Sequence, residues 1–376
     1  MTDKELFFFV AKCLALDENP GFKNEIISNV QSDRIDWQDF VALCSNHLIL
    51  PAIFIKFKTH RILQHLPNEL TDYLQEVYAL NEARNRGILD QLQGIVDELN
   101  KRGIAPVFLK GAAYLLDGLF STIGERILGD IDFLVEERDY LLSASLLKQA
   151  GYQEVKETPE YKDINTFKHY PLLFHPDHAA TVEIHRIPTD ESFLGWFNTE
   201  ILNREKIVPA SLTGCFVLSD KHKIVHNFIH SQLSNEGFLY GTVSLREIYD
   251  LYLLSKRFPL ERVLPEIKSK QKAIAYFALA RNLLGLDEAF FHQKNLAYRI
   301  LRKRLVLHIG SRRFYNFSRG LIFIFQRIFS GYFGQILKAI YSKQKRQYLS
   351  RRIRSRKWYG DHVRLYTGFF RHRKNK

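Results

Sequence analysis

The sequence predicts an α+β fold in which a small mixed sheet is flanked by N-terminal and C-terminal helical regions. The chain has 376 residues, of which 46% are hydrophobic and 13% aromatic, enough for sizeable cores. Apolar residues recur at helical spacing before residue 101 and again after residue 219. Between these stretches, short apolar runs alternate with helical patterns and then follow one another directly. Four regions result: helical 1–101, an α/β core at 102–190, helical 191–300, and a basic, aromatic-rich region at 301–376.

The N-terminal region contains the longest predicted helix. Helices are expected near residues 3–16 and 37–57, the second of them broken around Pro51. The third spans 67–102, carries leucines at three- and four-residue spacing, and ends at Gly103. We expect this helix to pack on the sheet, and its sequence indicates no chemistry.

The core begins with a strand, a glycine-led helix and a second strand. The strands are VFLKG at 107–111 and DIDFLV at 130–135, and a further helix follows at 137–151. Three strands complete the predicted sheet: YQEVKE, FKHYPLLFH and TVEIHR.

Two aspartates stand out in the second strand. Asp130 and Asp132 are two positions apart, so the alternation of a strand directs both to one side of the sheet. Two carboxylates this close repel unless a positive charge lies between them, and Mg²⁺ or Mn²⁺ suits such oxygen ligands. On these residues alone, the alternative is a strand end with two solvated aspartates.

A third carboxylate follows in the last strand. In TVEIHR, Val182 and Ile184 share one face while Glu183 and His185 share the other. If this strand neighbours the aspartate strand, Glu183 completes a cluster with Asp130 and Asp132. In-line phosphoryl displacement with two metal ions needs such a cluster.

The first strand leads into a candidate phosphate turn. Lys110 and Gly111 end the strand and open the helix, where a glycine lets backbone amides approach an anion. A triphosphate could rest there, although a tight turn without a ligand fits equally well. Arg126, shortly before the aspartates, could clamp a phosphate or pair with an aspartate.

These motifs resemble a known family. LKG, then R-x-x-x-D-I-D-F-L-V, then a strand with E-I-H, are similar to the uncharacterised bacterial nucleotidyltransferases of the polymerase β-like superfamily, over roughly residues 30–260. The resemblance implies a nucleotidyltransferase-type sheet, catalytic metal ligands at Asp130, Asp132 and Glu183, and an NTP such as ATP as substrate. The superfamily has Gly-Ser in the phosphate turn, whereas this chain has Gly111-Ala112. Nucleotide binding would therefore rely on backbone amides there and on Lys110 or Arg126.

The resemblance makes a metal-dependent nucleotidyltransferase the leading hypothesis. It would transfer a nucleoside monophosphate to a hydroxyl acceptor, which the sequence does not identify, and release pyrophosphate. Two alternatives stay open: a non-catalytic relative that binds a nucleotide or a partner, and a metal-dependent sugar-nucleotide glycosyltransferase.

The second helical region carries polar residues at helical spacing. His222, His226 and His230 recur every four residues, but the glutamate of a zinc-binding H-E-x-x-H motif is absent. We expect a polar face near the cleft. Arg246 and Asp250, also four apart, are expected to form a structural ion pair.

The basic charge is concentrated at the C-terminus. Residues 301–376 hold 21 Lys and Arg and one acid, whereas the chain as a whole has a net charge of +13. Apolar and aromatic residues at 319–341 precede seven Lys and Arg at 345–357. This pattern fits an anionic membrane surface or a helix packed on the protein, and it fits a nucleic acid less well because phosphate binding does not require so apolar a stretch.

Three scattered cysteines and an N-terminus unlike a signal peptide favour a reducing compartment. The expected location is cytoplasmic, with peripheral contact at the inner face of the membrane as an option.

Overall fold

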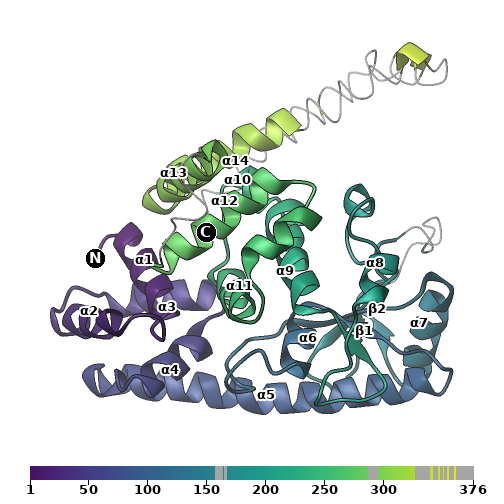
Figure 1. The fold of residues 1–376 in the computed structure, drawn as a ribbon, viewed down its shortest axis with the longest axis horizontal. Coiled ribbons are helices and arrows are strands. Elements are labelled where there is room, and N and C mark those ends of the chain that lie inside the picture. The colour runs from purple at the N-terminus through teal and green to yellow at the C-terminus, as the bar shows by residue number, and fades with distance from the viewer. Residues whose placement is uncertain are drawn as a thin grey trace. The chain divides into compact units, whose positions relative to one another are not determined.

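The computed structural model describes residues 1–156, 164, 167–286 and 295–326, with isolated residues between 339 and 360. A six-stranded mixed sheet has the order β3-β4-β5-β2-β1-β6, and helices flank it on both sides in sequence. The predicted α+β class is therefore confirmed (Figure 1). The strands are β1 (Val107–Phe108), β2 (Asp130–Leu134), β3 (Gln153–Glu154), β4 (Leu173–Phe174), β5 (Thr181–His185) and β6 (Phe216–Val217).

Strands β2 and β5 lie side by side in parallel, with Asp132 opposite Glu183. Strand alternation buries the apolar residues of both strands on one face, where Ile131 and Ile184 are completely inaccessible. The two strands are therefore neighbours, as the sequence analysis required for their carboxylates to share one face of the sheet. Strand β6, which pairs in parallel with β1, was not predicted because two residues are too few to display a period.

The N-terminal helices follow the prediction with two differences. The helices are α1 (Asp3–Cys13), α2 (Pro20–Gln31), α3 (Trp37–Asn46), α4 (Leu50–Thr59) and α5 (Asn68–Asn100). Helix α2 was not predicted, and the break between α3 and α4 precedes Pro51. Pro51 instead lies in the first turn of α4, where a missing backbone N–H costs nothing.

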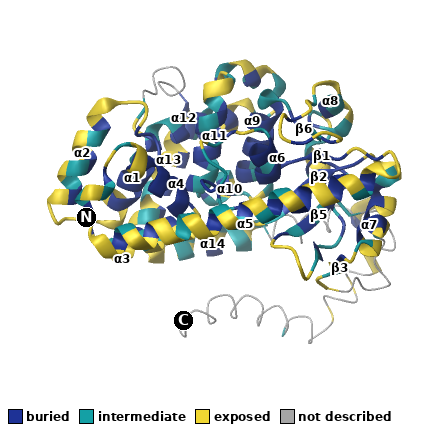
Figure 2. Ribbon diagram, turned by 90° about the horizontal axis from the view of Figure 1, so that it is seen from below, coloured by how far each residue is buried: buried dark blue, intermediate teal, exposed yellow. Residues whose placement is uncertain are grey.

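Helix α5 runs along the sheet and also contacts α4 and α7 (Tyr140–Gln149). Leu92, Ile95 and Leu99 are buried on its inner face, while exposed residues follow its outer side along its length (Figure 2). As predicted, this helix lies against the sheet, where Gln91 donates to the carbonyl of Ala180 beside β5 at 2.9 Å.

The remaining helices lie between the strands or after the last strand along the chain. They are α6 (Lys110–Leu116), α8 (Thr199–Arg204), α9 (Asp220–Phe228), α10 (Gly237–Tyr240), α11 (Leu245–Arg257), α12 (Lys270–Leu283), α13 (Leu296–Gly310) and α14 (Arg312–Gln326). A π-helical turn, Ile229–Ser234, continues α9.

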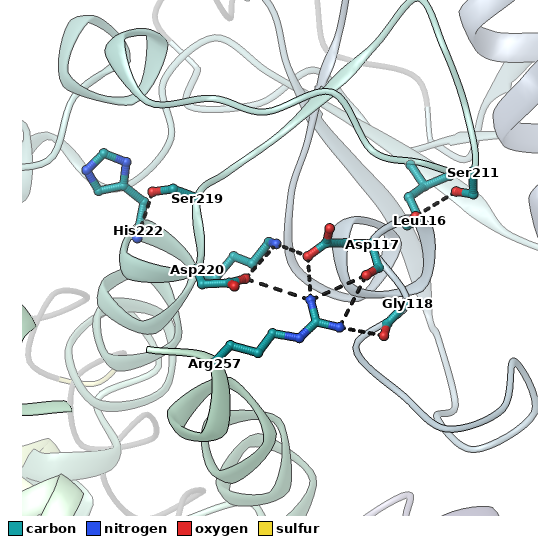
Figure 3. Close-up of polar contacts among 9 residues, drawn as sticks. Leu116, Asp117, Gly118, Ser211, Ser219, Asp220, His222 and Arg257 are labelled. Atoms are coloured by element: carbon teal, nitrogen blue, oxygen red, sulfur yellow. Dashed lines mark hydrogen bonds and ion pairs between the residues drawn. The ribbon is translucent and has the colours of Figure 1, made fainter. Parts of the chain in front are cut away.

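Helices α9 and α11 are joined to the end of α6 through charged groups. Arg257 of α11 donates to a carboxylate oxygen of Asp117 at 2.8 Å, and Lys223 of α9 pairs with the same carboxylate (Figure 3). Asp220 accepts from Lys223 at 3.0 Å. This network attaches the second helical region to the core.

The chain forms two compact units, residues 1–238 with 243–303 and residues 239–242 with 304–376. In the second unit, α14 exposes Phe317 and Leu321. The predicted membrane segment 319–357 lies mostly outside the described residues. Among those described, no single helix is long and apolar enough to cross a bilayer, and α3 with α4 passes that test only as a pair bent by 119°.

Candidate active site

The shared face of β2 and β5 carries a compact group of metal-binding residue types. One ligand atom each from Asp132, Glu183 and His185 lies within 4.8 Å of the others. Nε2 of His185 lies 2.8 Å from Oδ1 of Asp132 and 3.6 Å from Oε2 of Glu183. Asp132 and His185 are buried, whereas Glu183 is partly exposed. Two carboxylates and an imidazole in this arrangement fit a divalent cation.

The structure thus brings together two of the three predicted carboxylates and adds His185. The signal for His185 was present in the sequence, since it shares a strand face with Glu183. Asp130 lies outside this group, at the start of β2, where it lines an adjoining cavity.

A lysine supplies the positive charge beside the aspartates. Nζ of Lys110 donates to Oδ1 of Asp132 at 2.6 Å, and the backbone N–H of Leu109 donates to the Asp132 carbonyl. Lys110 has φ of 48°, in the left-handed region, which costs about 1 kcal/mol for a residue with a Cβ. The two bonds to Asp132 offset that cost.

Burial and hydrogen bonding shift the protonation of these groups in opposite directions. Burial raises the pKa of Asp130, and the negative charge of Asp132 raises it further. Burial acts the same way on Asp132, but hydrogen bonding from His185 and the charge of Lys110 outweigh it and lower its pKa. The hydrogen bond from His185 lowers the pKa of Glu183. Asp132 and Glu183 are therefore held ionised, as metal ligands must be.

A cavity of about 150 Å³ lies next to this cluster. Its lining combines residues of the α/β core with residues of α9, the π-helical turn and α11. The lining residues are Lys110, Gly111, Tyr114, Arg126, Gly129, Asp130, His226, Asn227, His230, Arg246, Glu247 and Asp250. Three of the four predicted nucleotide-binding residues are in this lining, while Ala112 is completely buried elsewhere.

Gly111 makes room for Arg126. A Cβ added at Gly111 would collide with Nη1 of Arg126 and lie 3.2 Å from Cγ of Leu128. The guanidinium of Arg126 therefore lies against the predicted phosphate turn, and a larger residue at position 111 would displace it.

Arg126 is fixed by a buried ion pair with α11. Its Nε and Nη2 donate to the two carboxylate oxygens of Asp250, both at 2.9 Å. Arg126 thus pairs with an aspartate, as one reading of the sequence had it, although that aspartate comes from α11. The predicted ion pair between Arg246 and Asp250 is wrong, because the carboxylate of Asp250 is occupied by Arg126 and Arg246 donates to the carbonyl of Ile127 at 3.3 Å.

Two of the three spaced histidines face the cavity. His226 stacks on Phe197 with 5.8 Å between ring centroids, and burial lowers its pKa, so it is neutral. Nδ1 of His230 lies 3.1 Å from Oε1 of Glu247. Within the described part of the chain, these histidines do not gather into a metal-binding group.

Helix α5 contributes residues that the sequence did not single out. Asn81 and Asn85 are buried and both donate to the backbone carbonyl of Arg126, at 3.1 and 2.9 Å. Arg84 donates to the carbonyl of Leu128 at 2.6 Å. These bonds fix the loop that delivers Arg126 to the cavity. Two asparagines four positions apart on an otherwise apolar helix face were the available signal.

A family model described as "Uncharacterised nucleotidyltransferase" matches residues 33–292. The chain belongs to this family. The match covers the sheet, the cavity and helices α3 to α12, so both walls of the cavity lie within the region that matches the family. No curated protein and no solved structure matches the chain.

Proposed function

We propose that this protein is a metal-dependent nucleotidyltransferase that transfers a nucleoside monophosphate from an NTP to a hydroxyl acceptor and releases pyrophosphate. The observation that carries the proposal is the parallel register of β2 and β5, with Asp132 opposite Glu183 beside a cavity lined by cationic side chains. Membership of the nucleotidyltransferase family supports it.

Asp132 and Glu183 would hold Mg²⁺ or Mn²⁺, with Asp130 adding a ligand from the cavity side, while His185 donates from Nε2 to Asp132 and orients that carboxylate. The bound ion would offset the charge of the triphosphate and make the acceptor hydroxyl more acidic. Lys110 already supplies a fixed positive charge at Asp132 and would also neutralise a phosphate oxygen.

The chemistry needs a proton acceptor that solvent and substrate can reach. Glu183 is partly exposed and ionised, so it would orient the acceptor hydroxyl and take its proton. The acceptor oxygen forms a bond to the α-phosphorus, the bond from that phosphorus to the β-phosphate oxygen breaks, and pyrophosphate leaves with the electron pair. Lys110 would stabilise the charge on the departing group.

The decisive experiment is mass spectrometry of cell extract incubated with labelled NTP and Mg²⁺, with and without the protein. A nucleotidylated species with matching pyrophosphate release is the expected result. Asp130→Asn and Glu183→Gln should abolish it, while Asp177→Asn, which removes an 87% exposed carboxylate, should not. Unchanged transfer by the first two variants would exclude this site.

The same assay separates the alternatives. Release of nucleoside diphosphate from nucleotide sugars would identify a glycosyltransferase. Magnesium-dependent nucleotide binding without turnover across a broad acceptor screen would identify a non-catalytic relative.

We further propose a cytoplasmic protein whose C-terminal region, 319–357, contacts an anionic membrane surface. Exposed Phe317 and Leu321 on α14 and the absence of Asp and Glu from residues 301–326 support this, because apolar and basic groups together bind anionic lipid. Sedimentation with anionic but not with neutral vesicles tests it, and binding to single-stranded nucleic acid instead of vesicles would contradict it.

A further inference from the structure

Arg246 lies in the cavity wall without a carboxylate partner. Its Nη1 donates to the carbonyl of Ile127 at 3.3 Å, and its buried Nε has no hydrogen-bond partner among the residues that the structure describes. Burial lowers the pKa of Arg246, and the neighbouring charge of Arg126 lowers it further. Arg246 is partly buried, and the charges of Asp250, Glu247 and Asp130 offset these effects only in part. A cation held there without an ion pair is unfavourable unless another group compensates.

The position of Arg246 along its helix adds to this cost. Ser244 is the N-cap of α11, so Arg246 stands in the first turn of a 13-residue helix. The N-terminus of a helix carries partial positive charge, which disfavours a cation there. A cation that lowers stability on both counts is expected where it serves a bound anion.

The other cationic groups of the cavity are already paired. Lys110 donates to Asp132 at 2.6 Å, and Arg126 is bidentate to Asp250. His230 contacts Glu247. Among the lining residues, Arg246 is therefore the cation whose charge is not met by a carboxylate within 4.0 Å.

We propose that Arg246 binds the β- and γ-phosphates of the NTP, so that α11 completes the anion site begun by Lys110 and Arg126. This inference rests on the proposed nucleotidyltransferase function. The planar guanidinium presents paired N–H donors that match two phosphate oxygens. The chain has Ala112 where the superfamily has a serine hydroxyl, and Arg246 supplies donors to the triphosphate from the opposite wall.

The test separates the oligophosphate from the rest of the nucleotide. Inorganic tripolyphosphate with Mg²⁺ is titrated into the full-length protein by calorimetry, and ATP and AMP are titrated in parallel. Arg246→Gln should weaken tripolyphosphate and ATP binding by at least about 30-fold, since loss of a buried charged partner has effects of that size. Its affinity for AMP should not change. Arg246→Lys keeps the positive charge but not the paired N–H donors of the guanidinium, so it should cause an intermediate loss of affinity.

Arg257→Gln is the matched control. Arg257 belongs to the same helix but pairs with Asp117, away from the cavity (Figure 3). Its removal should leave tripolyphosphate binding unchanged. The thermal midpoint of unfolding adds a second readout, because Arg246→Gln removes an unfavourable, partly buried charge and should not lower that midpoint.

The outcomes distinguish this inference from the function on which it rests. Equal tripolyphosphate affinity in wild type and Arg246→Gln overturns the inference, and ATP binding in both then leaves the proposed function standing. No tripolyphosphate binding by the wild type also overturns it. An equal loss for AMP, or a lower thermal midpoint, assigns Arg246 a structural role and overturns it as well. Arg246-dependent binding of tripolyphosphate without binding of any NTP supports the anion site and refutes the nucleotidyltransferase.

Discussion

The ion pair between Arg126 and Asp250 connects the loop before β2 to α11, and its energy can be measured. The side chains are 10% and 2% exposed, and two N–H donors meet two carboxylate oxygens at 2.9 Å. Removing either partner leaves the other buried and unpaired, which costs about 3–5 kcal/mol. We therefore expect Arg126→Gln and Asp250→Asn each to lower the free energy of unfolding by that amount.

The double variant removes both charges, so its cost should be close to that of one single variant. The resulting coupling energy equals one single cost, about 3–5 kcal/mol, at or above the upper end for residues in contact. Urea unfolding of the four proteins at neutral pH, followed by fluorescence, gives the cycle. The surface pair Arg204–Glu200, whose side chains are 70% and 77% exposed, is the control and should couple by less than about 1 kcal/mol. Additivity of the two single costs within about 0.5 kcal/mol would refute the reasoning.

Two further predictions concern Gly111 and His47. Gly111→Ala should cost about 1–3 kcal/mol in urea unfolding, because the new methyl overlaps Arg126, and a smaller cost when combined with Asp250→Asn, which frees Arg126 to move. An identical cost in both backgrounds would contradict this. Burial lowers the pKa of His47 from 6.5 to about 4, and its Nδ1 accepts from the N–H of Leu245 at 3.2 Å. The unfolded chain therefore takes up a proton first as pH falls, and about 3 kcal/mol of stability should be lost between pH 6.5 and 4. His47→Asn keeps an acceptor without titrating, so its unfolding free energy should fall less over that range, and an unchanged slope would show that other groups are responsible.

The sequence was sufficient where periodicity decides the structure. Alternation in β2 and β5 placed Asp132 and Glu183 on one face of the sheet, and the parallel pairing of those strands made the cluster. The 33-residue helix α5 was equally clear, because apolar residues at three- and four-residue spacing over that length fit only an α-helix.

The sequence was insufficient where a side chain chooses among distant partners. Asp250 lies 124 residues from Arg126 and four from Arg246, and local spacing favoured the nearer arginine. The choice depends on which guanidinium reaches the carboxylate with both donors once α11 lies against the core, and no local pattern encodes that. Likewise, Asn81 and Asn85 are ordinary helix residues until the loop carbonyls of Gly124 and Arg126 approach them.

The alanine at position 112, where the superfamily has serine, is explained by its place outside the cavity. Ala112 is completely inaccessible, and it is absent from the residues that line the cavity. A hydroxyl at that position would need a buried partner before it could serve a phosphate, and an unpaired one would cost about 1–3 kcal/mol. The cationic side chains Lys110, Arg126 and Arg246 do line the cavity, so an anion bound there would meet side chains from two separate parts of the sequence. A nucleotide bound there would contact both the sheet and α11, and loss of α11 from the core would remove Arg246, Glu247 and Asp250 from the cavity lining.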